Sequence, residues 1–246
     1  IVVRLVGSEM CIRDRTIGGK MELDADAATS DESVLTISGG FGTFRLGQED
    51  AVHETFGITE VDLIDEEGDG RYVGTATHTI SANAGEQGSN DTNKIAYITP
   101  AMGGFKAGIS VEDSGDDATT DMTAMGASYT MPLADGSLTV EYNQSTRDGA
   151  TDTDTTNMGA QFTMGAMSLI VASMTTETGT TEDQEGTGFA LKYDMGGGLT
   201  IAASATEVED TADTSAGENE KYTANIGEVV YTLSLIHISE PTRRTT

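Results

Sequence analysis

Apolar and polar side chains alternate along most of this 246-residue chain. Phe105, Ala107 and Ile109 alternate with Lys106 and Gly108. The same period of two recurs at 17–25, 125–131, 138–143, 158–164, 189–194 and 199–206. Since successive side chains of a β-strand point to opposite faces of a sheet, this period predicts strands with one apolar and one polar face.

The connections between these segments alternate between short and long. Tight, glycine-rich turns lie at 39–42, 101–104, 133–136, 165–166 and 196–197, and longer polar stretches lie at 28–33, 113–121, 146–157, 178–186 and 208–219. This asymmetry is typical of outer-membrane barrels, which have short turns at one rim and long loops at the other. The pattern predicts an all-β fold, an antiparallel up-and-down transmembrane β-barrel, with about twelve strands of roughly 8–11 residues present.

Aromatic residues gather near the predicted short turns: Phe41, Phe44, Phe105, Tyr129, Phe162 and Tyr193. Such a girdle suits a membrane–water interface, where amphipathic rings are favoured. The alternatives are a soluble acidic β-sandwich and a solenoid. A solenoid would repeat at a fixed length, and a sandwich would need bulkier inward faces, so the barrel is favoured.

The two ends of the chain are related through their coding DNA. One DNA sequence that encodes residues 5–15, LVGSEMCIRDR, has a reverse complement that encodes LSLIHISEPTR, the string at 233–243. This relation is typical of a sequencing adapter joined to both ends of a fragment and then translated. Residues 1–15 and 233–246 are therefore expected to be non-native and are excluded from the fold reasoning. The expected native part is a partial barrel over residues 16–232.

The chain is strongly acidic, with 41 Asp and Glu against 13 Lys and Arg and a net charge of −28. This charge argues against nucleic acid as a partner, because phosphate binding needs clustered cations. The only cysteine, Cys11, lies in the excluded N-terminal part, and no GxSxG motif is present, so we expect neither an enzyme nor a cofactor. The acidic loops allow weak Ca²⁺ binding, although no EF-hand spacing is present.

Two strings resemble a known family. SGGFGTFRLGQED (38–50) is similar to the strand–turn–strand that leads into the constriction loop of general bacterial porins. NKIAYITPAMGGFKAGISVE (93–112) is similar to the hairpin that follows that loop, particularly in porins of alphaproteobacterial type. The resemblance covers about a seventh of the chain and implies a barrel of about sixteen strands, usually trimeric, whose third external loop folds into the lumen. Residues 49–92 would form that loop.

In such porins, acidic residues on the loop face basic residues on the barrel wall. The acidic candidates implied here are Glu49, Asp50, Glu54, Glu60, Asp62, Asp65, Glu66, Glu67 and Asp69. The candidate wall cations are Arg45, Lys20, Lys106 and Lys192, whose facing follows from the alternation. The chain departs from the family in having few arginines, and a lumen this acidic is expected to favour cations.

The expected function is passive diffusion of small hydrophilic solutes and ions, with a cation preference, across the outer membrane of a Gram-negative cell. The expected partners are the lipid bilayer, the diffusing solutes and two further copies in a homotrimer. The alternative is an acidic cell-surface adhesin or another structural β-protein, which the Thr-, Asp- and Gly-rich loops also fit.

Overall fold

The computed structural model describes residues 3–6, 10–11, 15–23, 30–59, 63, 92–113, 121–149, 151–179, 182–210 and 220–231. The elements are β1 (Val3–Val6), β2 (Met10–Cys11), β3 (Arg15–Leu23), β4 (Ser30–Gly39), β5 (Gly42–Glu49), α1 (Val52–Thr55), β6 (Thr92–Ile98), β7 (Phe105–Glu112), β8 (Met122–Leu133), β9 (Gly136–Arg147), β10 (Thr153–Met164), β11 (Met167–Thr178), β12 (Glu182–Gly196), β13 (Leu199–Asp210) and β14 (Glu220–Tyr231). No helix in these ranges has the length and apolar character needed to cross a membrane.

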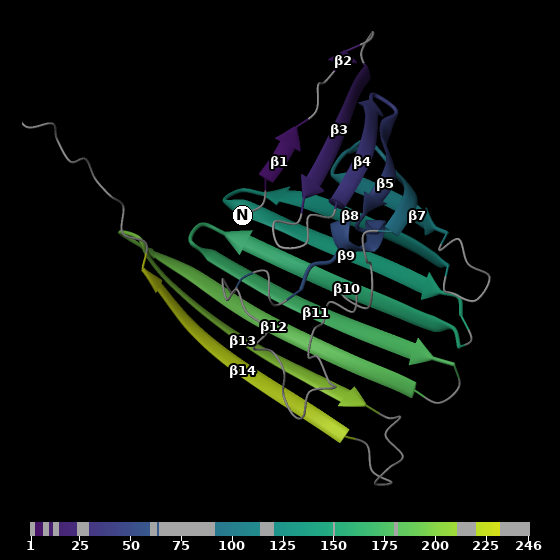
Figure 1. Ribbon diagram of the computed structural model, residues 1–246. Helices are drawn as coiled ribbons and strands as arrows, with labels where there is room; N and C mark the ends of the chain where they lie inside the picture. Colours follow the sequence, from purple (N-terminus) through teal and green to yellow (C-terminus); the bar gives the residue numbers. More distant parts are fainter. Residues whose placement is uncertain are drawn as a thin grey trace, which may run out of the picture.

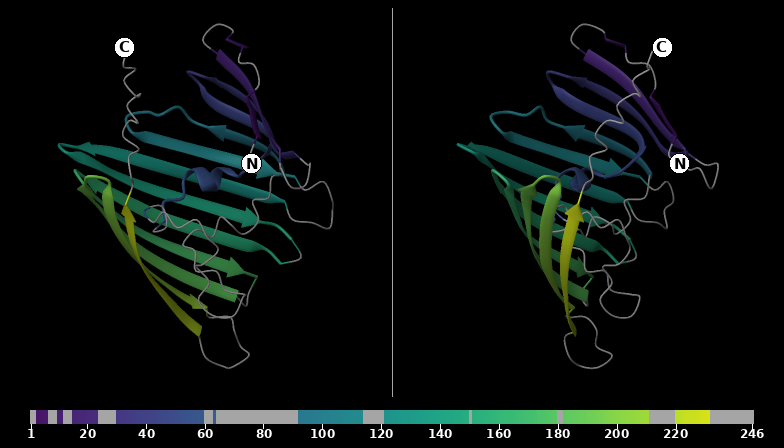
Figure 2. Two further views of the ribbon diagram at one scale, coloured as in Figure 1. Left: turned by 60° about the vertical axis from the view of Figure 1, so that its left-hand side comes forward. Right: turned by 90° about the vertical axis from the view of Figure 1, so that its left-hand side faces the viewer.

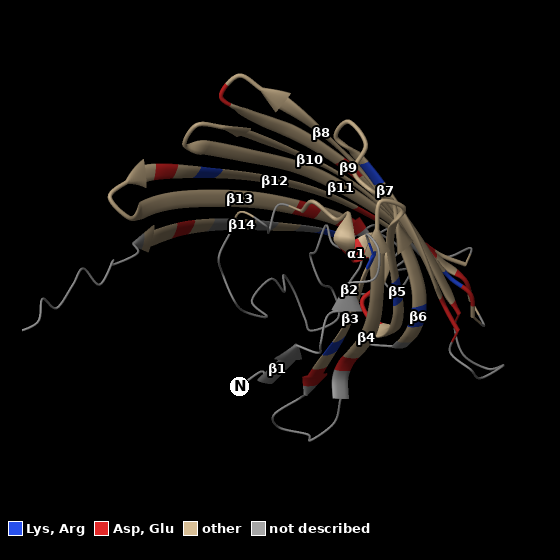
Figure 3. Cartoon of the chain, turned by 90° about the horizontal axis from the view of Figure 1, so that it is seen from above, with Lys and Arg blue, Asp and Glu red and all other residues tan. Residues whose placement is uncertain are grey.

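The strands form one antiparallel sheet in which each strand from β3 to β14 pairs with its neighbours in sequence (Figure 1). β1 and β2, from the segment 1–15, pair with β3. The sheet curves into an arc that stays open between β1 and β14, as the view from above shows (Figure 3). The prediction of an all-β, up-and-down antiparallel fold is confirmed, with the twelve strands β3–β14 spanning residues 15–231.

The two faces of the sheet differ as the alternation predicts. The outer, convex face carries large apolar side chains that remain exposed, among them Ile95 at 60%, Val111 at 52% and Val171 at 51%. The inner, concave face holds α1, which lies against it in both views of Figure 2. Water disfavours a continuous apolar face of this size, and hydrocarbon accommodates it.

The strands are longer than the sequence pattern predicts. Strands β8–β11, β13 and β14 have 12 residues each and β12 has 15. Parts of the polar stretches 146–157 and 178–186 therefore belong to strands rather than to loops. Threonine explains much of this difference, because its β-branched side chain favours extended backbone. Thr155 and Thr176 lie opposite each other with their Oγ1 atoms 3.3 Å apart.

The short turns lie at the rim of the sheet where the aromatic residues gather. Gly103 and Gly104 have φ values of 60° and 91°, a left-handed backbone that glycine adopts without strain. The Phe44 ring centroid lies 4.7 Å from that of Tyr97 and 6.1 Å from that of Phe41. The Tyr97 hydroxyl donates a hydrogen bond of 2.6 Å to the carbonyl oxygen of Phe41, which ties this rim together.

Candidate functional site

The chain that follows β5 turns inward and packs on the concave face. We call its described residues, 50–59 and 63, the inner segment. Three buried apolar clusters join it to the wall: Val52 and Phe56 with Ala96 and Ile98, Ala51 with Met122 and Ala124, and Ile58 and Leu63 with Ile170 and Ala190. The inner segment thus crosses the wall from β6 to β12, and all three clusters lie between the two.

Two wall side chains bond the backbone of the inner segment. The Val52 amide donates a hydrogen bond of 3.0 Å to Ser110 Oγ. Since α1 has no side-chain cap of its own, Ser110 of β7 satisfies an amide that the first helical turn leaves open. The Asn143 Nδ2 atom donates a buried hydrogen bond of 3.0 Å to the carbonyl oxygen of Phe56.

Charged side chains from the five strands β3–β7 surround the base of the inner segment. We call this set the basal charge cluster; it consists of Lys20, Glu22, Glu32, Arg45, Glu49, Asp50, Lys94 and Glu112. Arg45 Nε lies 3.1 Å from Glu49 Oε1, and Lys94 Nζ lies 3.3 Å from Glu112 Oε2. Lys20 pairs with Glu22 at 3.0 Å and also with Glu32. Each of the three cations therefore has a carboxylate partner, and the cluster holds five carboxylates.

Asp50 is the acid of this cluster that lies just beyond the end of β5. Partial burial raises the pKa of Asp50 above its ordinary value of 3.8, and the nearby Glu32 carboxylate raises it further. Lys94, Lys20 and Arg45 act in the opposite direction and offset part of this shift. The surroundings of Asp50 thus favour proton uptake at a higher pH than an isolated aspartate requires.

The structure places the wall cations predicted from the sequence in different surroundings. Arg45 and Lys20 belong to the basal charge cluster. Lys106 Nζ lies 5.7 Å from the centroid of the Phe56 ring, a cation–π contact with the inner segment. Lys192 lies on the inner face of β12, opposite Ser168 and Ala202, and forms no ion pair with the residues of the described ranges.

The predicted acidic residues are only partly within the described chain. Glu49 ends β5, Asp50 follows it, and Glu54 lies in the first turn of α1. Glu60, Asp62, Asp65, Glu66, Glu67 and Asp69 lie outside the described residues.

Sequence reasoning missed four members of the basal charge cluster: Glu22, Glu32, Lys94 and Glu112. Lys94 lies directly opposite Glu112 across β6 and β7, with 0% and 4% of their side chains exposed. The alternation along β6 indicates that Lys94 faces inward, because Lys94 shares a face with Ala96 while Ile95 and Tyr97 point outward. Ile98 lies on the same inner face as Lys94 and is apolar, so the sequence of β6 does not show a clear polar face.

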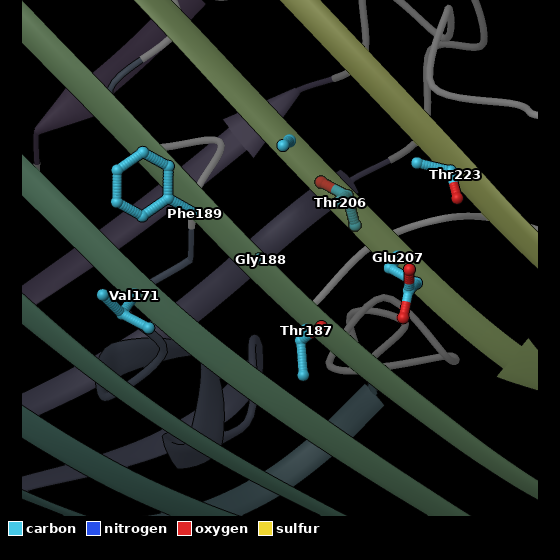
Figure 4. Close-up of a pocket in the computed structure, with 8 residues that line it drawn as sticks. Val171, Thr187, Gly188, Phe189, Thr206, Glu207 and Thr223 are labelled. Atoms are coloured by element: carbon cyan, nitrogen blue, oxygen red, sulfur yellow. The ribbon is translucent and has the colours of Figure 1, made fainter.

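A shallow groove lies elsewhere, on strands β11–β14 (Figure 4). Most of its lining comes from outward-pointing positions, including Val171, Phe189 and Glu207. Glu207 forms an ion pair of 2.6 Å with Lys221, and both side chains are about half exposed, at 47% and 54%. The groove is separate from the inner segment, which packs on the opposite face.

A curved antiparallel sheet that is apolar outside and polar inside, with a segment packed along its inner wall, is typical of the class of outer-membrane β-barrel proteins. The profile of the Gram-negative porin family matches residues 13–234, and the chain belongs to that family. Its location is the outer membrane. The subtype within the family stays a prediction.

Among curated proteins, the chain is 30% identical over 144 residues to outer membrane porin protein 32 of Delftia acidovorans. The match takes in 56% of this chain and 41% of the relative, so the chain spans about two-fifths of the length of the curated relative it matches.

Solved structures show the same fold at low identity. The loop L8 deletion mutant of Vibrio cholerae OmpT aligns with a TM-score of 0.67 and 13% identity over 95% of this chain and 86% of that one. Salmonella typhi OmpF in complex with daunomycin aligns with a TM-score of 0.68 and 13% identity over 92% and 77%.

Proposed function

We propose that this chain forms part of a passive diffusion channel for small hydrophilic solutes and ions. The observation that carries the proposal is the inner segment, which is fixed along the concave wall of a sheet whose other face suits lipid. In the proposed channel, a segment in this position narrows the lumen. The proposed role is transport rather than catalysis.

The proposed channel prefers cations. The basal charge cluster holds five carboxylates against three bases, and each base is paired with a carboxylate on the wall itself. Pairing cancels much of the positive field that unpaired wall cations would produce, and the excess carboxylates attract cations. We propose that Glu60, Asp62, Asp65, Glu66 and Glu67 add to this field as parts of the same loop.

Reconstitution in a planar bilayer tests both parts of the proposal. The purified gene product that carries these strands is expected to show stepwise conductance, and a salt gradient is expected to give a reversal potential on the cation-selective side. Absence of conductance steps would overturn the channel. Steps with an anion-selective reversal potential would leave the channel in place and overturn the cation preference.

The acidic adhesin is the second reading of this chain. It would have to keep Ile95, Val111 and Met158 in water on one face, where each exposes more than half of its surface. Nothing in the described inner wall favours it over a channel. A product that stays soluble without detergent would support the adhesin and contradict the channel.

We further propose that the complete protein assembles as a homotrimer and is of alphaproteobacterial type, and that residues 1–15 and 233–246 are translated adapter. The trimer rests on the resemblance at 38–50 and 93–112. Light scattering of the detergent-solubilised protein tests it, and a monomer mass would contradict it.

Sequencing the genomic locus tests the termini: native codons continuous with 5–15 and 233–243 would contradict the adapter origin.

A further inference from the structure

Three inner-wall glycines lie beneath the inner segment. A Cβ atom at Gly108 would lie 2.9 Å from Val52 Cγ1, one at Gly126 would lie 2.5 Å from Phe56 Cδ2, and one at Gly159 would lie 2.3 Å from the carbonyl oxygen of Ile58. We call Gly108, Gly126 and Gly159 the glycine track. Real Cβ atoms essentially never approach other heavy atoms within 3.0 Å, so atoms of the inner segment would have to shift to admit a side chain at any of these positions.

The three glycines lie on neighbouring strands of one stretch of wall, with Asn143 between them on β9. Gly108 and Gly126 are direct partners across β7 and β8, and Gly126 lies opposite Asn143 of β9, which bonds Phe56. Gly159 lies on β10 opposite Glu141, two residues from Asn157, the β10 partner of Asn143. The segment therefore rests on glycine backbone at β7, β8 and β10 and on the Asn143 side chain at β9.

We infer that the glycine track sets how deeply the inner segment sits against the wall, and thereby sets the free cross-section of the pore. This inference rests on the proposed channel function. The wall lies on one side of the segment and the lumen on the other, so atoms added to the track move the segment into the lumen. Rotation of the Phe56 side chain does not relieve the contact, because its own Cβ lies 2.7 Å from the position of a Gly126 Cβ.

Two hydrogen bonds and a cation–π contact hold the inner segment against the glycine track. Ser110 and Asn143 hold the backbone at Val52 and Phe56, and Lys106 lies over the Phe56 ring. These contacts keep the segment against the track, so the track sets the distance between the segment and the wall.

Unitary conductance of Gly126→Ala and Gly159→Ala in planar bilayers tests the inference. The matched control is Gly18→Ala, which adds the same methyl group to the inner face of β3, where a Cβ meets nothing within 4 Å. Both track variants are expected to conduct less than the wild type, and the control is expected to match the wild type. Equal conductance of track variants, control and wild type would overturn the inference.

A suppressor separates a displaced segment from general damage to the barrel. Phe56→Gly removes all three Phe56 atoms that a Gly126 Cβ would meet. Conductance of the Gly126→Ala/Phe56→Gly double variant is expected to rise above that of Gly126→Ala alone, whereas continued low conductance would contradict the inference.

Gel mobility before and after heating reports whether each variant folds. If neither alanine variant folds, Asn143→Ala replaces them, because it releases the segment without adding atoms to the wall. Its conductance is expected to fluctuate more than that of the wild type, and a wild-type trace would overturn the inference. A wild-type protein without conductance would instead contradict the proposed function.

Discussion

At the scale of single residues, Asn143 shows how the wall is adapted to the inner segment. Asparagine is depleted in strands, yet Asn143 lies in the interior of β9 with 3% of its surface exposed. Its side chain offsets that cost by donating to the carbonyl oxygen of Phe56. The residue is thus explained by a contact 87 positions away rather than by its own strand.

Asn143→Ala is expected to weaken the packing of the inner segment by about 1–3 kcal/mol, because it leaves a buried carbonyl oxygen without its donor. Hydrogen–deuterium exchange of residues 50–59 should become faster by a corresponding factor. Asn225→Ala, on the exposed outer face of β14, serves as the control. Unchanged exchange in the Asn143 variant would show that the bond does not hold the segment.

The pair formed by Lys94 and Glu112 supports a second prediction. Lys94→Met leaves the Glu112 carboxylate buried without its cross-strand cation, and loss of one partner of such a pair costs roughly 3–5 kcal/mol. Lys94→Met/Glu112→Leu removes one base and one acid together and should be less destabilised than Lys94→Met. Urea unfolding in lipid vesicles measures both, and a double variant as unstable as the single would contradict the pairing.

At the scale of elements, the inner segment follows β5 directly. Glu49 is the last residue of β5, and Asp50 is the first residue of the inner segment. The end of β5 therefore brings negative charge to the point where the segment turns inward. Burial and Glu32 keep the pKa of Asp50 above 3.8, so Asp50 loses its charge earlier than an ordinary aspartate as the pH falls.

Cation selectivity is accordingly expected to decline with falling pH, beginning above pH 3.8, where Asp50 takes up its proton. The same shift has a consequence for stability. The raised folded-state pKa favours the protonated folded protein, so Asp50 destabilises the fold above that pKa, and this penalty disappears as the pH falls toward 3.8. Reversal potentials measured between pH 7 and pH 3.5 test the selectivity.

Asp50→Asn should remove the first phase of that decline, whereas Asp135→Asn, in an exposed turn between β8 and β9, should leave it intact. A decline that is the same in both variants would assign the effect to other acids.

At the scale of the whole molecule, the described chain has its apolar side chains on the wrong face for a water-soluble protein. The inner wall packs buried apolar clusters against the inner segment, and the outer wall exposes large residues over its whole arc. Lipid therefore takes the place that a second sheet takes in a soluble β-sandwich.

Val171→Arg tests this arrangement. Val171 points outward from β11 with 51% of its surface exposed. An arginine there is expected to destabilise the folded protein in lipid vesicles by about 2–4 kcal/mol, because a cation in the apolar band loses its hydration. Val171→Leu is the control and should change stability little. A neutral effect of the arginine would indicate that this face meets water.

Much of the architecture was accessible from the pattern of residues. The period of two and the placement of glycine turns predicted the strands, their order and the facing of Lys106 and Lys192. The ends of the strands were less accessible, since threonine-rich stretches such as 153–157 are polar like loops but form strands. Of the basal charge cluster, the resemblance at 38–50 implied Lys20, Arg45, Glu49 and Asp50, while the other four members depended on pairing across strands.

The sequence by itself determined the faces of each strand, because a side chain's facing depends only on its position within an extended backbone. Only the tertiary structure decided which wall residues the inner segment, 50–59 and 63, contacts. That segment has no period of its own, and its contacts reach from Ala96 to Ala190, far along the chain. The surface it fits, including the bare backbone at Gly108, Gly126 and Gly159, exists only once seven strands have paired in register.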